Sequence, residues 1–248
     1  MKGGGKEAGD GALTKQTGWI SVPVVTGEID MAPNSPREEG SLDVIRHLVL
    51  LGDALQNIDL GGGQIESALV PRPRNPWKLT VLQALPRLQR GHVREIPEDA
   101  THVVVSIEGA WAIEASGLLR AGTHTIGEAL EALCAAADEF EGILGGLIAA
   151  AQETGLPTVV CTLVPARYAK PAEHRVASTA LAIFNDRVLR RAIAAGLHIV
   201  DLRLVCDEDA DYASATLLSR AGVRKAANVI RAALYDVSRP GGRTRVYF

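Results

Sequence analysis

The stretch Leu48-Val-Leu-Leu-Gly-Asp-Ala-Leu55 decides the fold of this chain of 248 residues. Its first four residues are apolar, and the pair Gly52-Asp53 ends the run. A short run that is apolar on both faces and is closed by turn-forming residues is typical of a parallel strand covered by helices on both sides. The stretch therefore predicts a buried strand over residues 48–51 with a loop at its carboxyl end.

Three later runs have the same character and predict further strands of one sheet. Each is short, rich in β-branched residues and apolar on both faces. They are His102–Ile107, Thr158–Leu163 and His198–Leu204.

A long helix is predicted between the second and third of these strands. Thr125-Ile-Gly-Glu128 is a capping-box sequence, in which Thr125 and Glu128 satisfy free backbone amides. Apolar residues then recur every three or four positions from Leu130 to Ala151. Gly155 closes the helix in the left-handed conformation and Pro157 prevents its continuation.

Two more helices are predicted, from about Ala172 to Ala195 and from about Ser219 to Tyr235. Strands and helices therefore alternate along the chain. Such alternation implies right-handed crossovers and a three-layer α/β/α sandwich with a parallel, flavodoxin-like sheet.

The composition divides the chain into a core and two extensions. Residues 1–42 form an N-terminal extension that is partly flexible, residues 43–238 form the α/β domain, and residues 239–248 form a C-terminal tail. Within the extension, the apolar patch Trp19–Val25 predicts an extra strand or a docking segment. The tail is interpreted as a final edge strand or a docking peptide.

Charge and hydropathy exclude several classes of protein. The formal net charge is -3 and no long basic run is present, so we expect no nucleic-acid partner. No stretch reaches the roughly 18–20 apolar residues of a spanning helix, and the N-terminus lacks a secretory signal, so we expect no membrane partner and a cytoplasmic location. Cys134, Cys161 and Cys206 have no metal-ligand spacing, so we expect three buried thiols, no metal and no cofactor.

Four blocks in order resemble the SGNH/GDSL hydrolase superfamily over about residues 46–237. The first is the opening stretch, which resembles the block around the family's nucleophile. The others resemble the family's third block, the helix that often carries A-L-x-x-F-N, and the last block with S-x-x-G-x-x-K-x-A; they are Thr101–Ile113, Thr179–Ala192 and Asp201–Ile230. The resemblance implies the SGNH-hydrolase-like α/β/α fold of an esterase or lipase.

The resemblance also implies a serine nucleophile, a histidine base oriented by an aspartate, and an oxyanion hole. This sequence departs from that set at every position. Ala54 stands at the serine position, Ala110 at the oxyanion asparagine and Leu217 at the histidine. The second block falls near residues 80–87, which contain no glycine for the remaining oxyanion donor.

Three residues of the degenerate cleft are candidates for a role. Asp53 organises the loop after the strand or acts as a general base. Glu108 forms a carboxylate pair with Asp53, or a salt bridge to an arginine such as Arg120 or Arg167; a buried carboxylate tends to have a raised pKa. Trp111 fills the old substrate pocket or offers a stacking surface.

These departures favour a non-catalytic protein that binds a protein partner or a small-molecule ligand through the old cleft or the extensions. The terminal extensions also suggest a homo-oligomer. One alternative is an enzyme with rewired acid/base chemistry that uses Asp53 and Glu108. Another is an active GDSL-type esterase or lipase whose catalytic set lies elsewhere, with Ser67 and Ser106 as candidate nucleophiles.

Overall fold

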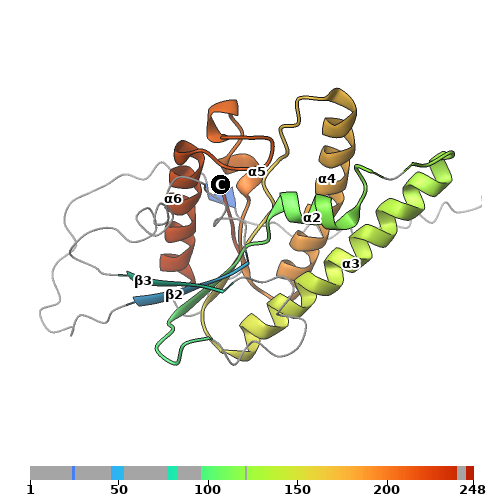
Figure 1. The fold of residues 1–248 in the computed structure, drawn as a ribbon. Helices are drawn as coiled ribbons and strands as arrows, with labels where there is room; N and C mark the ends of the chain where they lie inside the picture. The colour runs from blue at the N-terminus through green and yellow to red at the C-terminus, as the bar shows by residue number, and fades with distance from the viewer. Residues whose placement is uncertain (1–23, 26–45, 53–76, 83–95, 121, 239–243) are drawn as a thin grey trace, which may run out of the picture.

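A seven-stranded parallel sheet forms the centre of the molecule (Figure 1). The computed structural model describes residues 24–25, 46–52, 77–82, 96–120, 122–238 and 244–248. The strand order is β1-β7-β6-β5-β4-β2-β3. The strands are β1 (Val24–Val25), β2 (Arg46–Leu51), β3 (Trp77–Leu82), β4 (His102–Val105), β5 (Thr158–Cys161), β6 (His198–Val200) and β7 (Val246–Tyr247).

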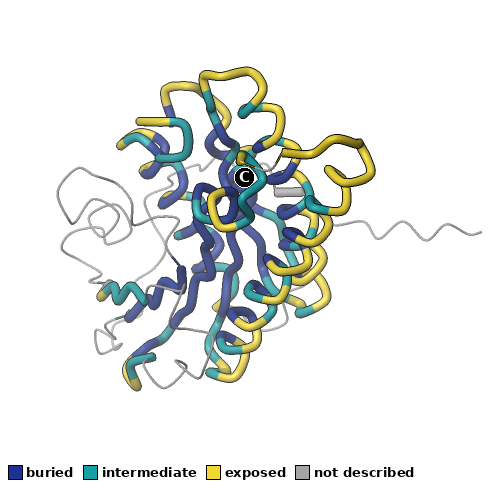
Figure 2. Tube along the Cα trace, turned by 45° about the vertical axis from the view of Figure 1, so that its right-hand side comes forward, coloured by how far each residue is buried: buried dark blue, intermediate teal, exposed yellow. Residues whose placement is uncertain are grey.

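Helices cover both faces of this sheet, so the predicted three-layer sandwich is confirmed (Figure 1). One face packs against α2, α3 and α4, and the other packs against α5 and α6. The elements are α2 (Gly109–Ser116), α3 (Ile126–Glu153), α4 (Pro171–Ala194), α5 (Leu202–Val205), the short 3-10 helix η3 (Asp209–Asp211) and α6 (Arg220–Val237). Figure 2 shows the buried strands between the exposed outer faces of the helices.

The order β3-β2-β4-β5-β6 is the flavodoxin-like order, as predicted. The chain moves outward from β2 to β3, then returns past β2 to β4 and continues in the opposite direction. The gap between β2 and β4 is therefore the topological switch point of the sheet. In open α/β sheets, ligands bind at the carboxyl ends of the strands that flank such a point.

The predicted strands differ from the observed ones mainly at their carboxyl ends. The first is confirmed as the apolar part of β2, and β4 and β5 are each two residues shorter than predicted. The prediction of strand over His198–Leu204 is wrong after Val200, because the Asp201 carboxylate accepts a hydrogen bond from Arg203 N–H and begins α5. The chain after the strand thus continues into a short helix that buries Leu202 and Val205 and leaves Leu204 exposed.

The sequence reasoning missed two elements, β3 and α2. β3 carries Lys78 and Thr80 among its apolar residues, and it is only partly buried because it lies at the edge of the sheet. α2 is eight residues long, and apolar side chains lie around most of its circumference. No amphipathic period therefore identifies it.

The N-terminal extension and the C-terminal tail each add a strand to the same sheet. Val24 pairs with Val246, and Ile199 of β6 pairs with Val246 on its other side. The patch therefore contributes a strand, one of the two predicted alternatives. β7 is a strand as predicted, but it lies between β6 and β1 and is not an edge strand.

The ends of α3 follow the predicted pattern. Thr125 Oγ1 accepts a hydrogen bond from Glu128 N–H at 3.1 Å. The Glu128 carboxylate accepts from His124 N–H at 2.8 Å, one residue before the cap. Gly155 closes the helix at a φ of +67°. These contacts satisfy amides that the helix itself leaves free.

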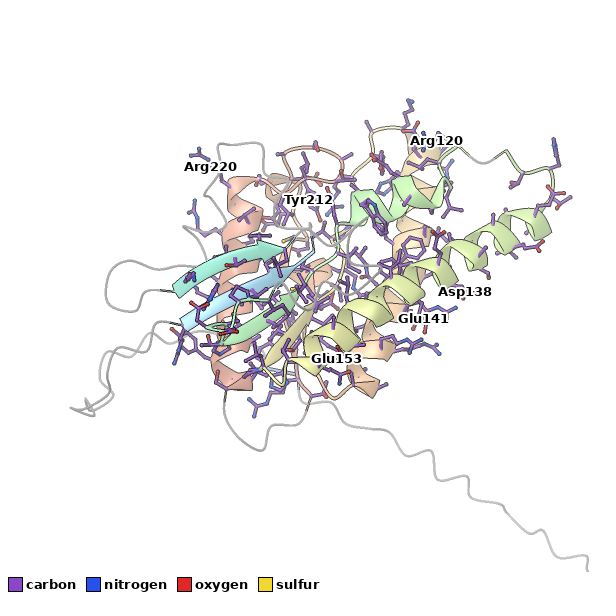
Figure 3. The ribbon with its side chains drawn as sticks, turned by 60° about the horizontal axis from the view of Figure 1, so that its bottom comes forward. Arg120, Asp138, Glu141, Glu153, Tyr212 and Arg220 are labelled. Atoms are coloured by element: carbon purple, nitrogen blue, oxygen red, sulfur yellow. The ribbon has the colours of Figure 1, made fainter. Side chains whose placement is uncertain are left out.

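α3 and α4 are joined by an apolar contact and by ion pairs. The rings of Phe140 and Phe184 stack at 4.9 Å between their centroids. The Arg187 guanidinium lies 3.1 Å from Asp138 and 2.8 Å from Glu141, which are labelled on α3 in Figure 3. The stacked pair contributes roughly 0.5–1.5 kcal/mol beyond its buried area, which is more than a partly exposed ion pair of this kind supplies.

The cysteines lie in two different environments. Cys161 and Cys206 are buried, but Cys134 is exposed on α3, so the prediction of three buried thiols is wrong for Cys134. Burial raises the pKa of the Cys161 thiol to about 12, and the neighbouring Ser106 hydroxyl only partly offsets that effect. Cys161 is therefore a protonated core side chain.

Replacement of Gly222 by alanine is expected to destabilise the fold. A Cβ at this position would lie 2.3 Å from the Asp211 carbonyl oxygen, so the backbone would have to move. We expect a loss of about 1–3 kcal/mol in the free energy of unfolding, measured by denaturant titration. Gly146→Ala is the matched control, because an added Cβ there meets no other atom within 4 Å. That variant is expected to gain roughly 0.5–1 kcal/mol from helix propensity; equal effects of the two changes would contradict the steric argument.

Candidate functional site

The candidate site lies at the carboxyl ends of β2 and β4, where the strand order switches direction. The described residues at this position are Gly52, which follows β2, and the turn Ser106–Gly109, which joins β4 to α2. Asp53 and Ala54 lie outside the described residues, so their roles and the pairing of Asp53 with Glu108 remain predictions.

Gly52 is required by a close approach of the two strand ends. Its φ is +115°, and an added Cβ would lie 2.0 Å from the Ser106 carbonyl oxygen. The Gly52 N–H donates to the Leu82 carbonyl at 3.1 Å, and Ser106 N–H donates to the Leu51 carbonyl at 2.9 Å. These bonds tie the ends of β2, β3 and β4 together.

Glu108 is buried at the point where β4 turns into α2. It is the N-cap residue of α2, and its carbonyl accepts from Ala112 N–H at 3.1 Å. Only 8% of the residue is exposed. The sequence therefore placed this carboxylate correctly at the carboxyl end of a core strand. Ala110, at the position where the resemblance implies the oxyanion asparagine, is buried as the second residue of α2.

Trp111 lies beside α3. It lines a shallow surface depression between α2 and α3, together with Ala115, Phe140, Ile143 and other residues of the two helices. Its ring is partly buried against the core on that face of the sheet. Whether Trp111 also fills the old substrate pocket remains a prediction.

Leu217 lies in the loop between η3 and α6. Its carbonyl accepts hydrogen bonds from Ala213 N–H at 2.8 Å and from Ser214 N–H at 3.4 Å. Tyr212 and Leu218 form an antiparallel bridge, so the loop is a closed turn. Leu217 is half-buried and has no group that can accept a proton, although the resemblance implies a base there.

Arg167 fastens this loop to the connection between β5 and α4. Its N–H donates to the Ala215 carbonyl at 2.6 Å, and its guanidinium donates to the Asp207 carbonyl at 2.6 Å. The guanidinium also lies 5.1 Å from the centre of the Tyr212 ring, a cation–π contact. Of the two arginines predicted as partners of Glu108, Arg167 is thus engaged by the 207–215 segment, and Arg120 is exposed (Figure 3).

The residues of the last block that match the family pattern have structural roles. Ser219 caps α6 by accepting from Gly222 N–H at 3.3 Å. The Lys225 ammonium lies 3.0 Å from the buried Asp211 carboxylate and 2.9 Å from Glu208. Gly222 gives the Asp211 carbonyl room to approach the helix. The pattern S-x-x-G-x-x-K therefore fixes the junction of η3 and α6.

A buried polar network at the ends of β5 and β6 was not predicted. The Thr162 hydroxyl donates to the Asp201 carboxylate at 3.0 Å and accepts from Leu202 N–H at 2.9 Å. Arg203 donates to both oxygens of Asp201, at 2.8 Å and 2.5 Å. Burial alone would raise the pKa of Asp201, but the bonds from Arg203 and Thr162 outweigh it and lower that pKa below its ordinary value.

Asn185 joins α4 to the end of β5. Its side-chain amide donates to the Leu163 carbonyl at 3.1 Å, and its side-chain oxygen accepts from Leu163 N–H at 2.7 Å. Asn185 is the last residue of the A-L-x-x-F-N resemblance, so this motif acts here as a clamp on the backbone after β5. The only sequence signal for that contact is the motif itself.

Comparison with known proteins identifies the fold. No family model matches the chain, and no curated protein matches it. Among solved structures, it is similar to a protein from Slackia heliotrinireducens assigned to the SGNH hydrolases (TM-score 0.50, 15% identity, 77% of this chain and 99% of that chain). It is also similar to a lipase/acylhydrolase from Enterococcus faecalis (TM-score 0.51, 14% identity, 80% of this chain and 100% of that chain). The extracellular lipase of Streptomyces rimosus matches at a TM-score of 0.51 and 13% identity, over 78% of this chain and 100% of the lipase.

The chain has the SGNH-hydrolase fold. At these identities the comparison shows the fold and leaves the activity open. Among the described helices, none is long and apolar enough to cross a membrane.

The ionised state of Asp201 is expected to contribute to stability in a pH-dependent way. A carboxyl whose pKa is lowered by folding stabilises the protein above the ordinary aspartate pKa, about 3.9, and loses that contribution as the pH falls through the lowered value. Asp201→Asn is therefore expected to be less stable than the parent at neutral pH, with a difference that shrinks below about pH 4. Unfolding by denaturant across this range measures it.

The matched control for this measurement is Asp186→Asn, which removes the exposed ion pair of Asp186 with Arg190 on α4. We expect that change to cost only about 0.3–0.5 kcal/mol. A difference between parent and Asp201→Asn that stays constant through the acid range would contradict the assigned charge state of Asp201.

Proposed function

We propose that this chain is a non-catalytic SGNH-hydrolase-like protein that acts as a binding or scaffold module. In this proposal, the cleft at the carboxyl ends of β2 and β4 and the terminal extensions bind a protein partner or a small-molecule ligand. The fold supplies the cleft, and the residues in it no longer support ester hydrolysis.

The observation that carries the proposal is the side-chain chemistry at the positions matched by the resemblance. Ala54, Ala110 and Leu217 are apolar, so none of them can attack a carbonyl, donate to an oxyanion or accept a proton. Loss of one oxyanion donor alone raises a barrier by about 2.7–4 kcal/mol. Joint loss of nucleophile, base and donor leaves no route for the family's chemistry through these positions.

Selective retention of structural residues supports the same proposal. Gly52 and Asn185 hold the backbone at the ends of β2 and β5, and Gly222 and Lys225 hold the junction of η3 and α6. A cleft that keeps its supporting residues while its reactive positions are apolar is suited to binding. The strands β1 and β7 add a second surface at the other edge of the sheet.

The burial of Glu108 favours one other function, rewired acid/base chemistry with Asp53. A carboxyl group with only 8% of its residue exposed, at the carboxyl end of a core strand, has the placement of a catalytic acid. This alternative predicts that loss of the two carboxylates slows ester hydrolysis, which the assay described next measures.

The assay is hydrolysis of a nitrophenyl acetate ester by the parent and by the double variant Asp53→Asn with Glu108→Gln. We expect equal rates, because the proposal gives neither carboxylate a part in turnover. General acid–base catalysis contributes about 100-fold or more, so a variant slower by that factor would replace the binding proposal with the rewired enzyme.

Binding through the cleft is tested by affinity capture with the parent and with Leu217→Arg. A partner bound at the cleft is expected to be lost when a long charged side chain replaces the half-buried Leu217. Ile193→Arg is the control, because Ile193 is 49% exposed near the carboxyl end of α4, at the opposite end of the strands. Partners retained equally by both variants would place binding outside the cleft.

A further inference from the structure

Away from the cleft, the apolar stripe of α3 continues beyond the part of the helix that packs on the core. Buried residues of the stripe recur at alternating spacings of four and three residues from Ala137 to Ala151. The same spacing extends backwards through Leu133 and Leu130 to Ile126. Leu130 is 57% exposed and Ile126 is 81% exposed. The α3 tip, residues 126–133, therefore presents to water the kind of stripe that the rest of the helix buries.

The α3 tip lies where α3 and α4 diverge toward their N-termini (Figures 1 and 3). Farther along the two helices, Glu141 of α3 pairs with Arg187 of α4 at 2.8 Å. Leu130 precedes Glu141 by eleven residues, about three helical turns, so both lie on the same side of α3. Val176 precedes Arg187 by the same number of residues, so it lies on the side of α4 that faces α3. Val176 is nevertheless 42% exposed, so the apolar side chains on the facing sides of the two helices do not cover each other.

The α3 tip and the start of α4 concentrate the exposed apolar surface of the described part of the chain. Three of its six large exposed apolar side chains lie here: Ile126, Leu130 and Val176. Single apolar side chains on a surface are ordinary, but a group of them on neighbouring elements marks an interaction site. Because this group lies on the stripes of two helices, the shape that it fits is another helix.

The charges around this surface identify the tip of a second copy as the helix that fits. α3 contains no lysine or arginine, and its tip carries the exposed Glu131. Arg175, the residue before Val176, is exposed on α4. Within the described residues, neither Glu131 nor Arg175 takes part in an ion pair. A tip packed on α4 of a second copy places an acidic side chain beside this arginine, whereas two tips packed on each other would bring together two acidic helices.

We propose that two copies of this chain associate about a two-fold axis, with the α3 tip of each copy packed on the first turns of α4 of the other. Ile126 and Leu130 of one copy contact Val176 of the second copy. Glu131 lies near Arg175 of the second copy, at the edge of the contact. The two-fold axis repeats the contact, so each copy supplies one tip and one acceptor helix. The surface contains no residue of the cleft, so the association does not depend on the proposed binding function.

Sedimentation velocity of the full chain over a range of concentrations tests the association. We expect a species of twice the 26.2 kDa mass of one chain as the concentration rises. Leu130→Asp is expected to raise the concentration at half association by at least about tenfold, because a charge replaces a central apolar contact. Leu204→Asp is the matched control, since Leu204 is 56% exposed on α5, which covers the other face of the sheet. A parent that stays monomeric, or equal losses of association in the two variants, would overturn the proposal.

Exchange of the two edge charges tests which helix the α3 tip contacts. Glu131→Lys and Arg175→Glu each place like charges at both contacts, so each variant alone is expected to associate about tenfold more weakly than the parent. In an equal mixture of the variants, a pair with one chain of each kind has opposite charges at both contacts. The mixture is therefore expected to associate nearly as strongly as the parent, with unchanged melting temperatures. A mixture that associates no more strongly than the separate variants would overturn the assigned contact between the α3 tip and α4.

Discussion

The close contact between the ends of β2 and β4 is the constraint on which the rest of the site depends. The Ser106 carbonyl approaches Gly52 so closely that no side chain fits there, and Ser106 N–H pairs with Leu51. Because these two strands flank the switch point, their contact fixes both the start of the loop after β2 and the start of α2. The buried Glu108 lies two residues after this contact, at the start of α2.

The sequence predicted the elements whose burial leaves a simple pattern. The run Leu48–Leu51 and the capped stripe of α3 are recognisable because one is covered on both faces and the other on a single helical face. β3 was missed because an edge strand tolerates Lys78 and Thr80, and β6 was predicted too long because Leu202 and Leu204 alternate with charged residues after Val200, as in a strand. Burial alone does not distinguish a strand from the helix that follows it. That distinction came from a single side chain, the Asp201 carboxylate that caps α5.

The sequence predicted the candidate site through residues that hold the backbone. These residues differ from the ones at which the family's reaction takes place. The last block kept Ser219, Gly222 and Lys225 because each one fixes the junction between η3 and α6. Leu217 lies in the preceding loop, where backbone hydrogen bonds and not the side chain close the turn. A resemblance built on such structural residues depends on the fold and does not depend on the reactive groups. For the same reason it identifies the fold reliably and says little about the reaction.

The hydrogen bonds of His47 illustrate the opposite case, in which sequence gives no signal at all. Thr80 and Asp99 lie 33 and 52 residues from His47 along the chain, and the parallel pairing of β2 with β3 and β4 brings them together. A buried histidine in a sheet needs partners for both ring nitrogens, and Asp99 and Thr80 supply them here. The partners of one buried imidazole thus come from three separate segments of the chain. No local pattern of the sequence marks them, because each residue is accounted for only by the pairing of the strands.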